Sequence, residues 1–315
     1  MTPRPGRFRA PAIAALALLA VAACAPAPEE GGSDPGAAVG SGSRPLRVVG
    51  STTVNPVVAR AAEELAASGG PRIVVDTQGG SSGGIAALGE GRADVAMASR
   101  PIGDGDRERY PETDFRPVSI GTDAVAIVVS RNVWEGGVRS LSRDEMRGIY
   151  EERITDWSEV GGAPGRIVLF DKEPGRGTWE VFADWLYGDA EEAPLVSHLE
   201  VGSNEEGRTK TASTPGAITQ LSAAWADGET VFALAIEPNP PAGGERPGGG
   251  GDTEMAPTPE AIAGGDYPMA RPLLVVTDGE PSPAARELIS FLLGPRGREL
   301  VVESGYLPPE VGGTS

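Results

Sequence analysis

The sequence predicts an α/β protein, because one pattern recurs along the chain: a short apolar strand, a turn rich in Gly, Ser or Thr, and then a helix. Strands that alternate with helices in this way indicate a mostly parallel sheet. The composition agrees, since 45 Gly and 29 Pro supply many turns and only 5% of the residues are aromatic. A chain of 315 residues is long enough for two lobes with separate cores.

The N-terminal segment has the features of a secretory signal. Three arginines precede an apolar run at 12–23 that is too short to span a bilayer as a stable helix. The run ends in small residues followed by Cys24, the single cysteine, and this pattern resembles a bacterial lipobox. We expect residues 1–23 to be a lipoprotein signal peptide and Cys24 to carry lipid; an ordinary signal with a chance cysteine is the alternative.

Composition restricts the chemistry and the partners. One cysteine excludes a disulfide framework, thiol catalysis and a Cys-based metal site, and we expect neither a metal nor a cofactor. Residues 24–45 are rich in Pro, Gly and Ser, which predicts a flexible tether. The formal charge is −18, and without residues 1–23 it is −21, from 24 basic and 45 acidic residues. Nucleic acid and anionic membrane surfaces are therefore poor partners.

Six short apolar runs between residues 46 and 236 are predicted strands. Two of them, 125–129 and 230–236, stand outside the strand–turn–helix units, and we expect them to be two crossings between the lobes. Residues 239–252 have no periodicity and are predicted to form a mobile loop. The six strands are expected at 46–49, 72–75, 94–97, 125–129, 166–170 and 230–236.

Helices are predicted where apolar residues recur at helical spacing after a turn. The first follows 50–53, and Thr53 or Asn55 is expected to cap it. Ser203 opens another with the spacing of a capping box, and Ser282 opens a helix near the C-terminus. The helix after 171–178 is expected to turn four side chains inward: Trp179, Phe182, Trp185 and Leu186.

The turn at Gly80–Gly84 matches the G-x-S-x-G pattern, which would make Ser82 a serine nucleophile. That reaction needs a general base, normally histidine. The single histidine, His198, lies at the edge of an apolar segment where nothing marks it as catalytic. An exported serine hydrolase that uses Ser82 is therefore kept as an alternative only.

The same turn also suits an anion. Helix N-termini leave N–H groups unpaired, and the helix dipole favours negative charge there. Glycine permits close backbone approach, and Ser81 and Ser82 add hydroxyl donors. Three such turns occur, at 50–53, 79–84 and 175–178, and the last also offers Lys172 and Arg176. Three turns of this kind in one chain indicate a binding site for a small oxyanion.

Seven segments in this order resemble the periplasmic phosphate-binding proteins of phosphate ABC transporters. Together they cover nearly all of residues 46–309, and it is the set that is specific. Relatives usually carry arginine where Lys172 stands and serine where Arg176 stands, so this chain moves a positive charge within the third turn. The segments are Gly50–Pro56, Gly79–Ile85, Ala93–Pro101, Gly175–Thr178, Thr214–Ile218, Thr258–Pro268 and Phe291–Gly297.

The resemblance implies a type II periplasmic binding protein with two lobes, each a mostly parallel sheet flanked by helices, joined by two hinge crossings. Lobe I is expected at 46–122 and 228–312, and lobe II at 123–227. Arg100 stands where some relatives have aspartate and others arginine, so it either contacts the ligand or pairs with an acid across the cleft. The ligand-binding residues implied are Ser51, Thr52, Thr53, Ser81, Arg100, Lys172, Arg176, Gly177 and Thr178.

The function that the resemblance implies is binding, not catalysis. The protein is expected to be a monomer, lipid-anchored to the cell membrane and facing the periplasm or the cell exterior, and to deliver inorganic phosphate to an ABC permease. A binding protein for another tetrahedral oxyanion such as sulfate is the main alternative. A carboxylate in the cleft would select monohydrogen phosphate over sulfate, and Asp123, Asp171 and Glu173 are candidates by position.

Overall fold

The computed structural model describes residues 44–194, 199–238 and 254–309. Cys24, the predicted tether, His198 and the predicted loop at 239–252 lie outside the described residues. Within residues 44–315 the contacts form one compact unit. None of the helices in the described part of the chain combines the length and the apolar character that crossing a membrane requires.

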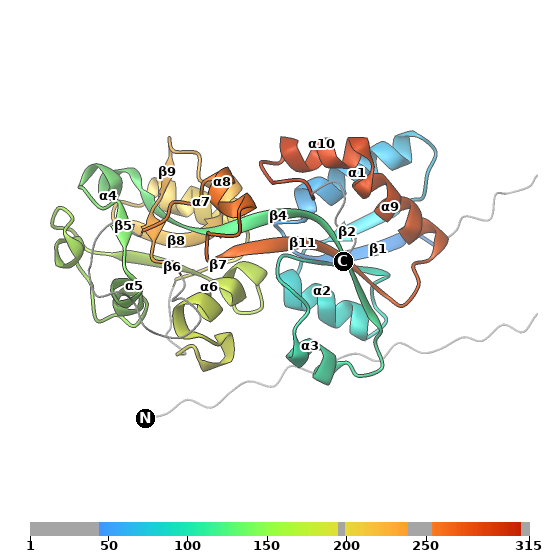
Figure 1. The fold of residues 1–315 in the computed structure, drawn as a ribbon, viewed down its shortest axis with the longest axis horizontal. Coiled ribbons are helices and arrows are strands. Elements are labelled where there is room, and N and C mark those ends of the chain that lie inside the picture. Colours follow the sequence, from blue (N-terminus) through green and yellow to red (C-terminus); the bar gives the residue numbers. More distant parts are fainter. Residues whose placement is uncertain (1–43, 195–198, 239–253, 310–315) are drawn as a thin grey trace, which may run out of the picture. The chain divides into compact units, whose positions relative to one another are not determined.

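A nine-stranded mixed sheet runs through this unit in the order β2-β1-β3-β11-β4-β8-β6-β7, with β9 beside β4 (Figure 1). The outer strands pair in parallel, and β11 and β4 pair antiparallel with their neighbours. A second, two-stranded sheet joins β5 and β10. The strands are β1 Leu46–Gly50, β2 Ile73–Asp76, β3 Val95–Ala98, β4 Phe115–Ser130, β5 Ser140–Leu141, β6 Val168–Lys172, β7 Leu199–Val201, β8 Ala217–Ser222, β9 Val231–Ala233, β10 Ala235–Ile236 and β11 Ala270–Asp278.

Helices cover the sheet, and several begin at the carboxyl end of a strand, as the α/β pattern predicts. Most predicted strands appear within one or two residues of their expected positions. The helices are α1 Asn55–Ala67, α2 Gly80–Gly89, α3 Asp104–Arg109, α4 Arg131–Glu135, α5 Arg143–Tyr150, α6 Gly177–Tyr187, α7 Asn204–Ser213, α8 Pro259–Ala263, α9 Pro283–Leu293 and α10 Pro295–Glu303, with short 3₁₀ turns η1 Trp157–Val160, η2 Ala190–Glu192 and η3 Ala223–Trp225.

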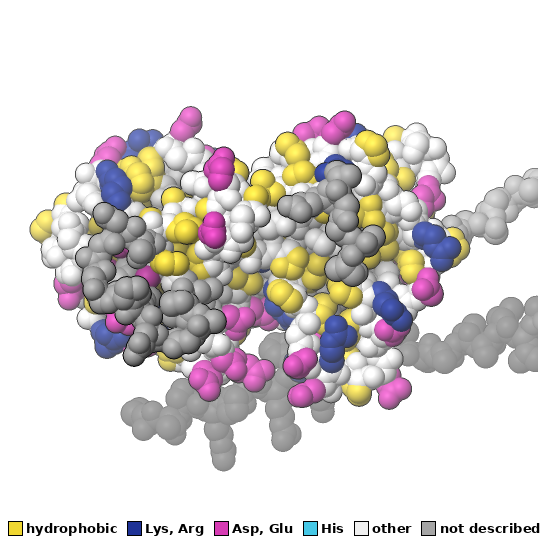
Figure 2. Space-filling model, in the orientation of Figure 1, with side chains coloured by type: hydrophobic (Ala, Val, Ile, Leu, Met, Phe, Trp, Pro, Cys, Tyr) yellow, Lys and Arg dark blue, Asp and Glu magenta, His cyan; other side chains and the backbone are white. Residues whose placement is uncertain are grey.

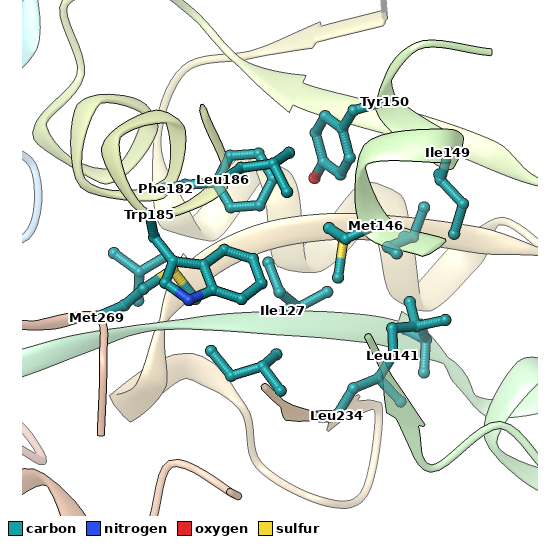
Figure 3. Close-up of a cluster of buried hydrophobic side chains, with 14 of the residues drawn as sticks. Ile127, Leu141, Met146, Ile149, Tyr150, Phe182, Trp185, Leu186, Leu234 and Met269 are labelled. Carbon is teal, nitrogen blue, oxygen red and sulfur yellow. The ribbon is translucent and has the colours of Figure 1, made fainter. Parts of the chain in front are cut away.

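Two large hydrophobic cores stabilise the two halves of the sheet. The first core packs α1, α9 and α10 on strands β1, β3, β4 and β11, and α2 covers the other face of these strands. The second core lies around the far half of β4 (Figure 3). There Phe182 and Trp185 of α6 meet Tyr150 and Met146 of α5 over Ile127. Of the predicted inward face of α6, Phe182, Trp185 and Leu186 are buried and Trp179 is half-buried.

The strands that contribute to both cores are β4 and β11 (Figure 1). The predicted crossing at 125–129 forms part of β4, whereas 230–236 does not cross. Val231–Ala233 instead pairs with the far end of β4, and Ile236 packs in the second core. The crossing role belongs to β11, whose pairing with β4 places Arg271 opposite Asp123. The lobe boundary at 122/123 stays a prediction, whereas residues 231–236, predicted in lobe I, contact the second half instead.

Two of the predicted helix caps are confirmed and one is wrong. Ser203 Oγ accepts the N–H of Glu206 at 3.0 Å, and Ser282 caps α9, as predicted. The prediction that Thr53 or Asn55 caps α1 is wrong, because Val54 occupies the N-cap position without a side-chain bond. The Thr53 hydroxyl is engaged by other side chains, which removes it from the capping role.

Candidate functional site

Three loop–helix junctions meet at one buried group of hydroxyls. Thr53 lies just before α1, Ser81 lies in the first turn of α2, and Thr178 lies in the first turn of α6. All three side chains are at most 4% exposed. Each junction is also a helix N-terminus, where N–H groups lack intrahelical partners and the dipole is positive. The structure thus brings the three Gly, Ser and Thr turns of the sequence to one place.

Gly177 approaches this group so closely that no side chain fits. A Cβ at this residue would lie 2.5 Å from Ser81 Oγ and 2.7 Å from Ser99 Oγ. Both distances are shorter than real Cβ contacts, so glycine is required for the close approach. The first residue of α6 therefore lies directly against the hydroxyls of the first half.

Arg271 of β11 is a buried cation that the sequence analysis did not single out. Its side chain has no exposed surface. The guanidinium donates to Asp123 Oδ2 at 2.8 and 3.0 Å, to Thr178 Oγ1 at 3.0 Å and to Thr53 Oγ1 at 3.3 Å. Longer contacts of 3.4 Å reach the carbonyl and the hydroxyl of Ser99. One side chain thus joins the first turn, the third turn and the end of β3.

Asn204, the first residue of α7, determines the direction of the Thr53 hydroxyl. Its Oδ1 accepts the backbone N–H of Ser222 at 3.3 Å, so the amide NH₂ must face Thr53 Oγ1, which lies 3.1 Å away. Thr53 Oγ1 therefore accepts from both Asn204 and Arg271. A hydroxyl has two acceptor lone pairs and one proton, so the Thr53 proton is left to donate.

A chain of three serines has a direction for the same reason. Ser51 Oγ accepts the N–H groups of Thr53 and Val54, so it donates to Ser99 Oγ at 3.0 Å. Ser99 Oγ accepts from Ser51 and from the guanidinium described above, so its proton goes to Ser81 Oγ at 3.4 Å. Ser81 Oγ also accepts the Ser99 N–H at 3.1 Å. The proton of Ser81, like that of Thr53, is left to donate.

Lys172 lies beside this group but points its amine elsewhere. Nζ donates to the backbone oxygens of Ser203 at 2.6 Å and Gly202 at 3.4 Å. Burial, and next the repulsion from Arg176 and Arg271, lower the pKa of Lys172 to about 7. In this structure Lys172 ties β6 to the start of α7 rather than donating to the hydroxyls.

The two other predicted cations pair with acids. Arg100 forms ion pairs with Asp106 and with Glu180 of α6. Arg100 was predicted either to contact the ligand or to pair with an acid across the cleft, and the structure shows a pairing with an acid of the second half. Arg176 pairs with Glu173 beside it. Thr52 is half-buried in the first turn.

The three candidate carboxylates differ in their surroundings. Asp123 is buried and accepts from Arg271 and, through Oδ1, from Ser222 Oγ at 2.8 Å. Asp171 accepts a hydrogen bond from Gln220. Glu173 is the partner of Arg176. Asp123 is thus the acid that belongs to the buried group, where it offsets the charge of Arg271.

Ser82 has the surroundings of a structural residue. Its Oγ donates to Glu180 Oε1 at 2.6 Å and accepts from Arg100 at 3.0 Å. Glu180 is itself held by an ion pair with Arg100, so its carboxylate takes part in a structural contact. The nucleophile hypothesis therefore gains nothing from the described contacts.

Comparisons with known proteins show the family and the fold of this chain. A family model described as the PBP superfamily domain matches residues 32–296. The phosphate-binding protein PstS of Bacillus subtilis is 26% identical over 294 residues, which cover 92% of this chain and 90% of that protein. An ABC-type phosphate transport receptor from Vibrio cholerae has a similar structure, with 26% identity, a TM-score of 0.65 and coverage of 84% of this chain and 100% of the receptor.

A further solved structure shares the fold. A Clostridium perfringens protein crystallised with bound phosphate superposes with a TM-score of 0.69 at 24% identity, over 85% of this chain and 100% of that one. The mixed sheet with helices on both faces is therefore the architecture of two-domain binding proteins.

Proposed function

The chain belongs to the PBP superfamily, and from this premise we propose that it binds inorganic phosphate outside the cytoplasmic membrane and delivers it to the permease of an ABC importer. Relatives named for phosphate binding and phosphate transport support this proposal. The role is that of a substrate-binding protein, not of an enzyme. The anchor at Cys24, the monomeric state and the permease partner are parts of the same proposal.

One observation about the chain itself carries the proposal: the hydroxyls of Ser81 and Thr53 have their acceptor sides filled and their protons left to donate. Donors that converge at helix N-termini suit a ligand that is rich in acceptors and negatively charged. A tetrahedral oxyanion is such a ligand. The donors that we assign to it are Thr52, Thr53, Ser81, Gly177 and Thr178, with Ser51 acting through Ser99.

The acidic surface does not prevent anion binding here. Acidic side chains are spread over the face seen in Figure 2, with single basic ones between them, in line with the formal charge of −18. Repulsion from these charges is screened over about 8 Å at physiological ionic strength. The buried donors act at contact distance, where they outweigh that residual repulsion.

Entry of the ligand requires motion, because the donor side chains are buried. They come from both halves of the sheet, and β4 and β11 are the strands that join these halves. Separation of the halves about these two strands would open the site, as in hinge closure of binding proteins.

Isothermal titration of the chain without residues 1–43 tests the proposal. We expect one phosphate per chain, weaker heats with sulfate, and an affinity that falls about 10- to 150-fold in Ser81→Ala, since a hydrogen bond to a charged group contributes about 1.5–3 kcal/mol. Ser213→Ala, at an exposed serine at the end of α7, is the matched control and should bind normally. Absence of phosphate binding by the unmodified chain would refute the function, and tighter sulfate binding would favour the other oxyanion.

A further inference from the structure

Arg271 and Asp123 have contacts that the proposed donor set does not explain. We propose that Arg271, held in place by Asp123, is a positioning residue that directs the hydroxyl protons of Thr53 and Thr178, and through Ser99 that of Ser81, toward the bound oxyanion. The inference rests on the proposed function and assigns the residue that prepares the site for a ligand made of acceptors.

Geometry makes Arg271 an organiser of other donors. Its five N–H groups all have protein acceptors, because Nε and Nη2 bond to Asp123, Nη2 also bonds to Thr53, and Nη1 is shared between Thr178 and Ser99. The guanidinium therefore acts on a ligand through the hydroxyls that it contacts. Each of these hydroxyls loses an acceptor lone pair to Arg271 and keeps its proton for another partner.

The effect extends beyond direct neighbours. Arg271 occupies the lone pair that Ser99 would otherwise offer to Ser81, so the serine chain can run only from Ser51 through Ser99 to Ser81. Without the guanidinium, Ser99 could accept from Ser81, and the Ser81 proton would point away from the ligand. A single cation thus orients donors in both halves of the protein.

Asp123 holds the guanidinium in the position from which it can bond to these hydroxyls. The two residues stand directly opposite each other in the β4–β11 ladder, and both are buried. Ser222 Oγ fixes the second carboxylate oxygen at 2.8 Å. A buried ion pair is weak evidence for a stability role, because apolar residues of similar volume often serve stability equally well. The contacts of Arg271 with hydroxyls on two different helices favour the positioning role.

A double-mutant cycle tests the inference by phosphate titration. Arg271→Gln should weaken phosphate binding about 30-fold or more, whereas Arg286→Gln, at an exposed arginine of α9, should leave it unchanged. Thr178→Val removes the hydroxyl that Arg271 orients. We expect its effect, about 10-fold or more in the unmodified chain, to shrink to about 2-fold in the Arg271→Gln background, since residues that act as a unit are not additive.

Arg271→Lys covers the case in which the glutamine variant fails to fold. Lysine keeps the positive charge opposite Asp123, so the variant should fold. Lysine has three rotatable donors in place of the planar fork of arginine, so the variant should bind phosphate weakly and lose the coupling to Thr178. Full binding by the Arg271 variants, or fully additive effects of the two substitutions, would overturn the inference. Absence of phosphate binding by the unmodified chain would instead refute the proposed function, so the two failures are distinguishable.

Discussion

Glu180 of α6 accepts a 2.6 Å hydrogen bond from Ser82 Oγ of α2, and these helices pack in different hydrophobic cores. Arg100 strengthens the contact through its ion pair with Glu180 and its bond to Ser82. The backbone repeats the connection, since Ser82 N–H donates to the Gly175 carbonyl at 3.0 Å. These groups form a polar contact between the halves that does not involve the proposed phosphate donors.

Glu180→Gln is expected to weaken phosphate binding because it destabilises the closed form, in which the two halves are in contact. The variant loses the charge that Arg100 pairs with, which costs the closed form about 1–2 kcal/mol and lowers the apparent affinity about 5- to 30-fold. Titration gives the affinity, and stopped-flow release should show faster dissociation. Glu205→Gln, at an exposed residue of α7, is the control. Equal affinity and release rate in the two variants would show that the contact does not hold the halves together.

Gly177→Ala is expected to prevent full closure. The added Cβ would lie 2.5 Å from Ser81 Oγ, so the halves must move apart at an expense of about 1–3 kcal/mol, the usual range for overpacking. Phosphate affinity should fall about 5- to 150-fold in titration. Gly165→Ala is the matched control, because a Cβ there meets open space and its φ is not left-handed. Unchanged affinity in Gly177→Ala would contradict the close approach of α6.

Lys172 is expected to make stability depend on pH. Its pKa is about 7 in the folded chain against 10.5 for an ordinary lysine, so between these values the unfolded chain holds the proton and the folded chain does not. Stability therefore rises as the pH increases from 7 toward 10.5, by about 2 kcal/mol between pH 7 and pH 9 for this group. Urea unfolding at several pH values measures this rise.

A comparison of two variants isolates the lysine. Lys172→Met should remove most of the rise in unfolding free energy, whereas Lys210→Met, at a lysine of α7 whose side chain is 42% exposed, should retain it. Parallel pH profiles for the unmodified chain and Lys172→Met would mean that the buried amine stays charged throughout this range.

Phe182→Ala is expected to destabilise the second core. Phe182 is 2% exposed, and its ring centroid lies 4.5 Å from that of Tyr150 and 6.2 Å from that of Trp185 (Figure 3). Loss of a buried phenyl ring should lower the free energy of unfolding by about 3–5 kcal/mol in urea titrations. Leu199→Ala, at a leucine that is 58% exposed, should change it by about 0.5 kcal/mol or less. A loss below about 1 kcal/mol would contradict the packing of this core.

The sequence predicted most strands and the three turns because these features are local. Apolar runs, glycines and hydroxyls stand next to one another in the chain, so Ser81, Gly177 and Thr178 could be read as one kind of junction. Arg271 and Asn204 could not be predicted as site residues, because neither lies in such a turn. Each reaches the site only through the tertiary fold. A usable signal did exist: Arg271 and Asp123 are charged residues that directly precede or begin apolar runs, Arg271 near the start of β11 and Asp123 just before the apolar part of β4.

The arrangement of the first core also governs when the chain can fold. Its N-terminal strands and α1 pack on β11, α9 and α10, which lie about 200 residues later in the chain. Contacts of such high sequence separation form late, since the intervening loop must close first. Strand β1 and helix α1 therefore lack these hydrophobic partners until synthesis is almost complete. We therefore expect the first core to acquire its native packing only after β11, α9 and α10 have been synthesised.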